Sequence, residues 1–189
     1  MGIDMSRRVG MFQASLATLR GLWRGETVDE PRYWQIEQAS IAPLPPEPVD
    51  VWIGAVAQPA VHRSAQLGEG WLAAPSLTVP EAGDAINGYR QACAEFGRDP
   101  TAVAIRRDIY VGATSAEARS VVQPYIDAGY RGMSEGALLF GSVAEVADQI
   151  AALGELGYTD VIVRNLSSDQ AECLATIERL AEVRSQLHG

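Results

Sequence analysis

The chain has 189 residues, of which 47% are hydrophobic and 21% charged, so it can build the core of one domain or of part of a larger one. Its net charge is -9, and all 15 basic residues are arginine. This acidity argues against nucleic acids and anionic membrane surfaces as partners, because both require clustered cations. A phosphorylated small ligand stays compatible, because a helix N-terminus and one arginine can hold a phosphate.

The cysteines and histidines limit the chemistry. Cys93 and Cys173 fall at apolar positions of predicted helices, which indicates buried thiols and a reducing, cytoplasmic setting rather than a disulfide framework. His62 and His188 have no metal-ligand neighbours at useful spacing, so we predict no metal site. The first ten residues are polar, which argues against a signal peptide, and no apolar stretch is long enough to span a bilayer.

The first predicted helix carries apolar residues at steps of three or four, which is one helical face. We expect Ser6 to cap its start and Gly25 to mark its end. The apolar positions are Val9, Phe12, Leu16, Leu19 and Trp23. Five prolines then make residues 26–50 an irregular connector, in which Tyr33, Trp34 and Ile36 add a short strand or pack the segment down.

Four strand-and-helix units are predicted after the connector. The strands are 49–54, 70–75, 102–112 and 159–165, and residues 129–141 form a glycine-rich surface loop. Helices follow at 59–67, 79–96, 115–128, 143–156 and 170–187. Strands that alternate with helices predict a parallel sheet with right-handed crossovers, an α/β fold.

Three helix starts carry capping patterns, namely Thr78 with Glu81, Ser142 with Glu145, and Ser167 with Gln170. In the last helix we expect four apolar residues to line the inner face: Leu174, Ile177, Ala181 and Leu187. Trp71 is expected in the core.

Several sequence pieces occur in an order that resembles the luciferase-like monooxygenase family. The resemblance runs from about Arg8 to Val163, and its specificity comes from the order, since no single piece is diagnostic. The pieces are Leu22–Trp23 before the connector, Val51–Gly54, Leu67–Trp71, Tyr89–Arg90 with Gly97–Pro100, and Leu139–Ser142 with Glu145–Ala147 and Gly157.

The resemblance implies a partial (β/α)8 TIM barrel, with about four C-terminal units in a single half-barrel domain over 1–189 that includes the 26–50 connector. A full barrel needs about 250 residues, and four strands cannot close. An open parallel sheet leaves two unpaired edges. The chain is therefore a fragment that pairs with a missing N-terminal half, a half-barrel that forms a homodimer, or a degenerate relative.

The family's chemistry implies a flavin-dependent oxidoreductase or monooxygenase that uses FMN or the deazaflavin coenzyme F420 on a small organic substrate. The alternative is a catalytically inactive truncated relative that acts as a flavin-binding or dimerising structural module. A third interpretation is a flavin-free barrel fragment that binds another phosphorylated metabolite. No catalytic triad or P-loop stands out, so no catalytic residue is assigned.

Barrel enzymes place their sites at the C-terminal ends of the strands. The first candidate there is the turn formed by Gly54, Ala55, Val56 and Ala57, which in the family resembles a phosphate cradle. Alanine and valine replace the expected glycine and hydroxyl residues, so the backbone N–H groups and the helix dipole would hold the anion. The alternative is an ordinary turn between a strand and a helix.

Arginines supply the other two candidates. Arg106 shares one side of the third strand with Asp108, which suggests either a cofactor contact or a structural ion pair. Arg164 and Asn165 end the last strand, where an arginine suits a phosphate or an anionic flavin ring, with a surface salt bridge as the alternative. Arg107 interrupts the aliphatic side of the third strand and is expected where that strand reaches the protein surface.

Overall fold

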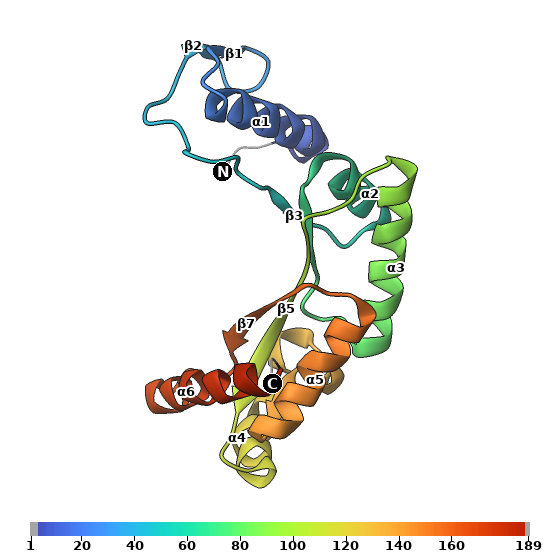
Figure 1. The fold of residues 1–189 in the computed structure, drawn as a ribbon, viewed down its shortest axis with the longest axis vertical. Coiled ribbons are helices and arrows are strands. Elements are labelled where there is room, and N and C mark those ends of the chain that lie inside the picture. The colour runs from blue at the N-terminus through green and yellow to red at the C-terminus, as the bar shows by residue number, and fades with distance from the viewer. Residues whose placement is uncertain (1–3, 188–189) are drawn as a thin grey trace. The chain divides into compact units, whose positions relative to one another are not determined.

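The computed structural model describes residues 4–187 (Figure 1). The chain divides into two compact units, Met1–Val49 and Asp50–Gly189. The expectation that residues 1–189 form a single half-barrel domain stays a prediction.

The first unit contains one long helix and a small hairpin. Helix α1 spans Arg8–Trp23, and the strands β1 (Val28–Glu30) and β2 (Ile36–Ala39) pair antiparallel inside the predicted connector. The prediction that Ser6 caps α1 is wrong. Ser6 lies in a short 3-10 turn, where its backbone N–H donates to Asp4 Oδ1 at 2.9 Å, and no side chain caps the helix start.

The second unit is built on one parallel sheet, as predicted. Its strands are β3 (Trp52–Gly54), β4 (Gly70–Ala73), β5 (Ala102–Val111), β6 (Leu139–Gly141) and β7 (Asp160–Asn165). The order is β3-β4-β5-β6, and β7 pairs with β5 as well. β5 is the central strand: β4 is in register with its first residues, β6 with its last, and β7 with Ala104 to Ile109.

β6 corrects the predicted surface loop over 129–141 and makes the sheet five-stranded rather than four-stranded. The strand is only three residues long and pairs with Ile109–Val111 at the far end of β5. Three residues are too few to show a hydrophobic alternation in the sequence. The burial of Leu139, which is 4% exposed, and of Gly141 marks the segment as part of the sheet.

Five helices accompany the sheet: α2 (Gln58–Leu67), α3 (Val79–Glu95), α4 (Ser115–Asp127), α5 (Val143–Leu156) and α6 (Gln170–Leu187). The capping boxes predicted at the starts of α3 and α5 are both present. No helix within residues 4–187 is long and apolar enough to cross a membrane.

Helix α6 departs from two predictions. Its first turn is capped by Asp169, whose Oδ1 accepts from the Glu172 N–H at 3.0 Å, rather than by Ser167 with Gln170. Its inward side carries Thr176 and Val183, which are buried, whereas Leu174 and Ile177 are more than half exposed. Ala181 is exposed too, and of the predicted inner face only Leu187 packs against the core.

Two apolar cores sandwich β5. The larger core packs one face of the sheet against α2, α3, α5 and α6, and Trp71 at its centre stacks on Tyr89 with 4.8 Å between ring centroids. The smaller core joins Tyr110 to α4 through Ala118 and Val122. Because α4 covers the opposite face only at the end of β5, the earlier part of that face carries the polar residues described below.

Candidate active site at the strand ends

The side chains of β5 alternate as predicted. Val103, Ile105 and Ile109 enter the larger core, and Arg106 and Asp108 point to the opposite face. Asp108 is fully buried and Arg106 is about one third exposed along its side chain. This face is where a barrel would enclose its interior.

Arg106, Asp108 and Tyr130 form a linked polar group. Arg106 Nε lies 3.4 Å from Asp108 Oδ1, and the Tyr130 hydroxyl donates to Asp108 Oδ2 at 2.9 Å. Burial and the hydrogen bond to Asp108 raise the pKa of the Tyr130 phenol, so it stays a donor at neutral pH. Arg106 and Asp108 thus form an ion pair, which the sequence analysis gave as the alternative to a cofactor contact. Within the described residues, Arg106 Nε and Asp108 Oδ1 still have no hydrogen-bond partner.

Arg164 lies beside this group on the neighbouring strand. It is in register with Asp108, and equivalent residues of adjacent parallel strands face the same way. The side chain of Arg164 is exposed and has neither a hydrogen bond nor an ion pair within residues 4–187, so the surface salt bridge is not seen. Asn165, the next residue, points to the opposite face and is half-buried.

The turn after β3 is held by its neighbours on β4. The Ala55 N–H donates to Leu72 O at 3.4 Å, and Trp71 Nε1 donates to Ala55 O at 3.0 Å. Trp71 is therefore a core residue, as expected, and also fixes this turn. Ala57 is the N-cap of α2 in an extended conformation and supplies no side-chain cap. A Cβ placed on Gly54 would meet nothing closer than Leu72 O at 4.0 Å, so the strand end is open.

The sheet separates the turn from the arginines. Gly54 is level with Ala104 across β4, whereas Arg164 is level with Asp108 on the far side of β5. With about 4.8 Å between strands and 3.3 Å per residue, the Cα atoms of Gly54 and Arg164 lie roughly 20 Å apart. The structure thus brings Arg106 and Arg164 together and places the turn of Gly54, Ala55, Val56 and Ala57 elsewhere on the same sheet.

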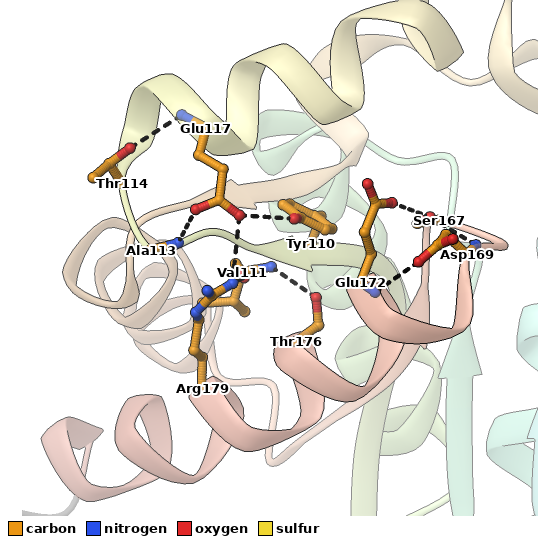
Figure 2. A network of polar contacts seen from close by, with 10 residues as sticks. All are labelled: Tyr110, Val111, Ala113, Thr114, Glu117, Ser167, Asp169, Glu172, Thr176 and Arg179. Atoms are coloured by element: carbon orange, nitrogen blue, oxygen red, sulfur yellow. Dashed lines mark hydrogen bonds and ion pairs between the residues drawn. The ribbon is translucent and has the colours of Figure 1, made fainter.

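A second polar network at the end of β5 was not predicted (Figure 2). Glu117 on α4 accepts from the Tyr110 hydroxyl at 3.0 Å and from the Ala113 N–H at 2.8 Å. Arg179 on α6 lies 3.6 Å from the same carboxylate and donates to Val111 O at 2.9 Å. Burial, followed by the bond to Glu117, raises the pKa of Tyr110 to about 12. The network fastens α4 and α6 to β5 and so supports the face that carries Asp108.

We expect Glu117→Gln to destabilise the protein by about 1–3 kcal/mol, because an amide cannot accept at both oxygen positions and leaves a donor unpaired. Urea unfolding followed by circular dichroism measures the loss, and the Ala113 amide should exchange its hydrogen faster. Glu182→Gln, at an exposed position of α6, is the matched control. Equal stability of the two variants would contradict a structural role for Glu117.

Arg107 is buried, whereas the sequence analysis expected it where β5 reaches the protein surface. It lies mid-strand, 1% exposed, and its Nη1 donates to Pro75 O at 3.2 Å. Nε and Nη2 have no partner in the described part of the chain. Burial lowers the pKa of Arg107. This burial could not be predicted from the sequence, because arginine is rarely enclosed without a charged partner.

A surface cleft of about 740 Å³ between α4, β6 and α5 contains none of the predicted site residues. Its polar side chains largely satisfy one another: Arg119 Nη2 lies 2.7 Å from Glu135, and the Ser115 hydroxyl donates to Glu145 at 2.6 Å. We therefore place the candidate site at the strand ends.

Within residues 4–187, no group of three or more His, Cys, Asp or Glu side chains could hold a metal ion. His62 Nε2 lies 3.0 Å from Glu95 Oε2 at the surface. His188 lies outside the described residues.

The parallel sheet and the sequence pattern agree with a family model. The chain belongs to the luciferase-like monooxygenase family, whose model matches residues 1–135. A curated relative is the phthiodiolone/phenolphthiodiolone dimycocerosates ketoreductase of Mycobacterium kansasii, which is 27% identical over 108 residues, or 54% of this chain and 29% of that protein.

Solved structures share the fold at low sequence identity. The monooxygenase RslO1 from Streptomyces bottropensis has a TM-score of 0.73 at 18% identity, covering 99% of this chain and 64% of its own. An F420-dependent secondary alcohol dehydrogenase in complex with an F420-acetone adduct has a TM-score of 0.75 at 13% identity, covering 97% and 64%. The oxygenating constituent of 3,6-diketocamphane monooxygenase from Pseudomonas putida, in complex with FMN, has a TM-score of 0.70 at 16% identity, covering 92% and 62%.

These likenesses show the fold, an α/β arrangement that corresponds to part of a luciferase-like TIM barrel. The chain spans less than two thirds of each structural neighbour and 29% of the curated relative.

Proposed function

We propose that this chain provides the C-terminal half of a flavin- or deazaflavin-dependent oxidoreductase, which acts on a small organic substrate in the cytoplasm. Family membership carries the proposal, and neighbours with bound FMN or an F420 adduct support the choice of cofactor. When bound, the cofactor supplies the hydride or oxygen chemistry, and the protein binds and orients it.

The turn after β3 fits the phosphate end of such a cofactor. The start of α2 has no side-chain cap, and the helix dipole favours an anion at this end. Pro59 has no N–H and the Ala60 N–H donates to Ala57 O at 2.8 Å, so the Gln58 N–H is the group of the first turn that would meet the anion. Gly54 leaves the approach open, and Trp71 fixes the carbonyl of Ala55 so that the turn is preorganised. We therefore assign the turn of Gly54, Ala55, Val56 and Ala57 to the phosphate, held by backbone N–H groups other than that of Ala55, which donates to Leu72 O.

Exposed apolar residues support the second candidate function, a structural module that pairs with another chain segment or a second copy. Trp52, Ile162 and Val163 on the sheet are each about 40% exposed, and Leu174 and Ile177 on α6 are more than half exposed. Large apolar surface of this kind marks an interface. A homodimer, or pairing with an N-terminal half, would cover it.

The N-cap of α2 offers a direct test of the phosphate assignment. Ala57→Asp should stabilise the protein by about 1 kcal/mol, because aspartate is a good N-cap and alanine is a poor one. The same carboxylate should weaken the binding of FMN and of F420 at least tenfold, because its negative charge at the start of α2 repels the phosphate. Ala57→Gly is the control, since it adds no competing side chain.

Fluorescence titration of the purified chain with FMN and with F420 gives the affinities, and the mass in solution is recorded alongside. Micromolar binding that Ala57→Asp weakens and Ala57→Gly preserves is the expected result. A well-folded chain that binds neither cofactor, but forms a dimer, would reject the enzyme assignment for this polypeptide and favour the structural module.

A further inference from the structure

Arginine side chains gather on one face of the sheet. Arg106 on β5 and Arg164 on β7 point the same way from neighbouring strands, two residues apart in register. Strand spacing places their Cα atoms roughly 8 Å apart. Two guanidinium groups at that separation can converge on one small ligand.

The charge near these arginines is positive, in a chain whose net charge is -9. Arg131 directly follows Tyr130, and both Arg164 and Arg131 counteract the rise in the pKa of the Tyr130 phenol, so their charges reach it. Asp108 balances one of the three arginines. Asp160 shares the face with Arg164 but is four residues away along β7, roughly 13 Å.

Unsatisfied polar atoms mark the same place. The side chain of Arg164 is exposed and has neither hydrogen bond nor ion pair within residues 4–187, and the buried Arg106 Nε lacks a hydrogen-bond acceptor there. Buried polar atoms in folded proteins are nearly always paired, so the unpaired Arg106 Nε suggests a missing ligand. Asp108 balances the charge of Arg106 but not that of Arg164, so the two guanidinium groups together keep a positive charge that suits an oxyanion.

We infer that Arg106 and Arg164 bind an oxyanionic group, a carboxylate, sulfonate or phosphate, with Asp108 and Tyr130 holding Arg106 in place. Because the turn after β3 is roughly 20 Å from Arg164, the arginines are separate from the cofactor's phosphate. The oxyanion then belongs to the substrate, which is an acidic small molecule. This last step rests on the proposed function, whereas the anion site itself does not.

The test is an NMR titration of the 189-residue chain with benzoate and, separately, with inorganic phosphate. We expect Arg164→Gln to weaken the binding of both anions at least tenfold, and Arg164→Lys to recover part of the loss. Arg184→Gln, at an exposed position of α6, should bind like the original chain. Arg164 is exposed, so its variants should keep the fold, which circular dichroism checks. Equal binding by the original chain and Arg164→Gln would overturn the site, whatever the flavin result.

A competition experiment tests whether the oxyanion belongs to the substrate or to the cofactor. If the substrate supplies it, saturating FMN leaves benzoate binding unchanged, and Arg164→Gln leaves FMN binding unchanged. If FMN displaces benzoate and Arg164→Gln weakens both equally, the arginines hold the cofactor and the substrate assignment is wrong. Benzoate binding that depends on Arg164 in a chain that binds no flavin would reject the proposed function and support the anion site.

Discussion

Trp71→Ala should lower the free energy of unfolding by about 3–5 kcal/mol, the range expected when a large aromatic side chain is removed from a packed core. Trp71 is 1% exposed, stacks on Tyr89 and lies 6.4 Å from the ring of Tyr158. Its indole also donates to Ala55 O, so the variant should loosen the turn after β3 and weaken FMN binding. Urea unfolding followed by circular dichroism gives the first effect.

Trp52→Ala is the matched control for that experiment. Trp52 is on the adjacent strand, faces the opposite side of the sheet and is 41% exposed. Trp52→Ala should lower the free energy of unfolding by well under half as much as Trp71→Ala does, because it removes little buried volume. Trp71→Phe separates packing from the hydrogen bond, since phenylalanine preserves most of the stacking but cannot donate to Ala55. Similar losses for Trp71→Ala and Trp52→Ala would contradict the core described here.

Arg107→Met should stabilise the protein by about 1–3 kcal/mol, although it removes a hydrogen bond. The arginine is buried, with a pKa lowered by desolvation, and two of its nitrogen atoms have no partner within the described residues. Burying a charge without a counter-charge costs more than one hydrogen bond to Pro75 O returns. Methionine fills similar space without a polar atom.

The measurement is the urea midpoint of Arg107→Met compared with Arg184→Met, which changes an exposed arginine and should stay within about 0.5 kcal/mol of the original chain. A destabilised Arg107→Met would show that Arg107 is needed where it is, for example to hold the segment around Pro75. That result would assign it a positioning role next to the strand ends.

Regular alternation and capping patterns allowed much of the fold to be predicted. The strands around Trp52, Trp71 and Ile105 combine apolar runs with glycine boundaries, and the helix after Thr78 begins with a full capping box. These signals are local, so the sequence contains them. The three residues of β6 are too few to show a period, and their strand depends on pairing with the distant end of β5.

The candidate site was predictable in its parts but not in its grouping. Residue types at strand ends pointed to Arg164 and the turn after Gly54, and the alternation of side chains along β5 pointed to Arg106. Only the register between β5 and β7 shows that the two arginines share a face, while Asn165 turns away from it. Tyr130 joins Asp108 from 22 positions along the chain, and no spacing rule reveals such a contact.

The central position of β5 has a consequence for the order of folding. Its partner β7 pairs from Ala104 with Asp160 to Ile109 with Asn165, so this edge closes only after more than fifty further residues have been synthesised. On a ribosome that adds about 5–20 residues per second, β5 therefore waits several seconds with the backbone N–H and C=O groups of one edge unpaired. Pairings of such long sequence separation also form slowly. We expect nascent chains that stop before β7 to be the form of this protein most prone to aggregation.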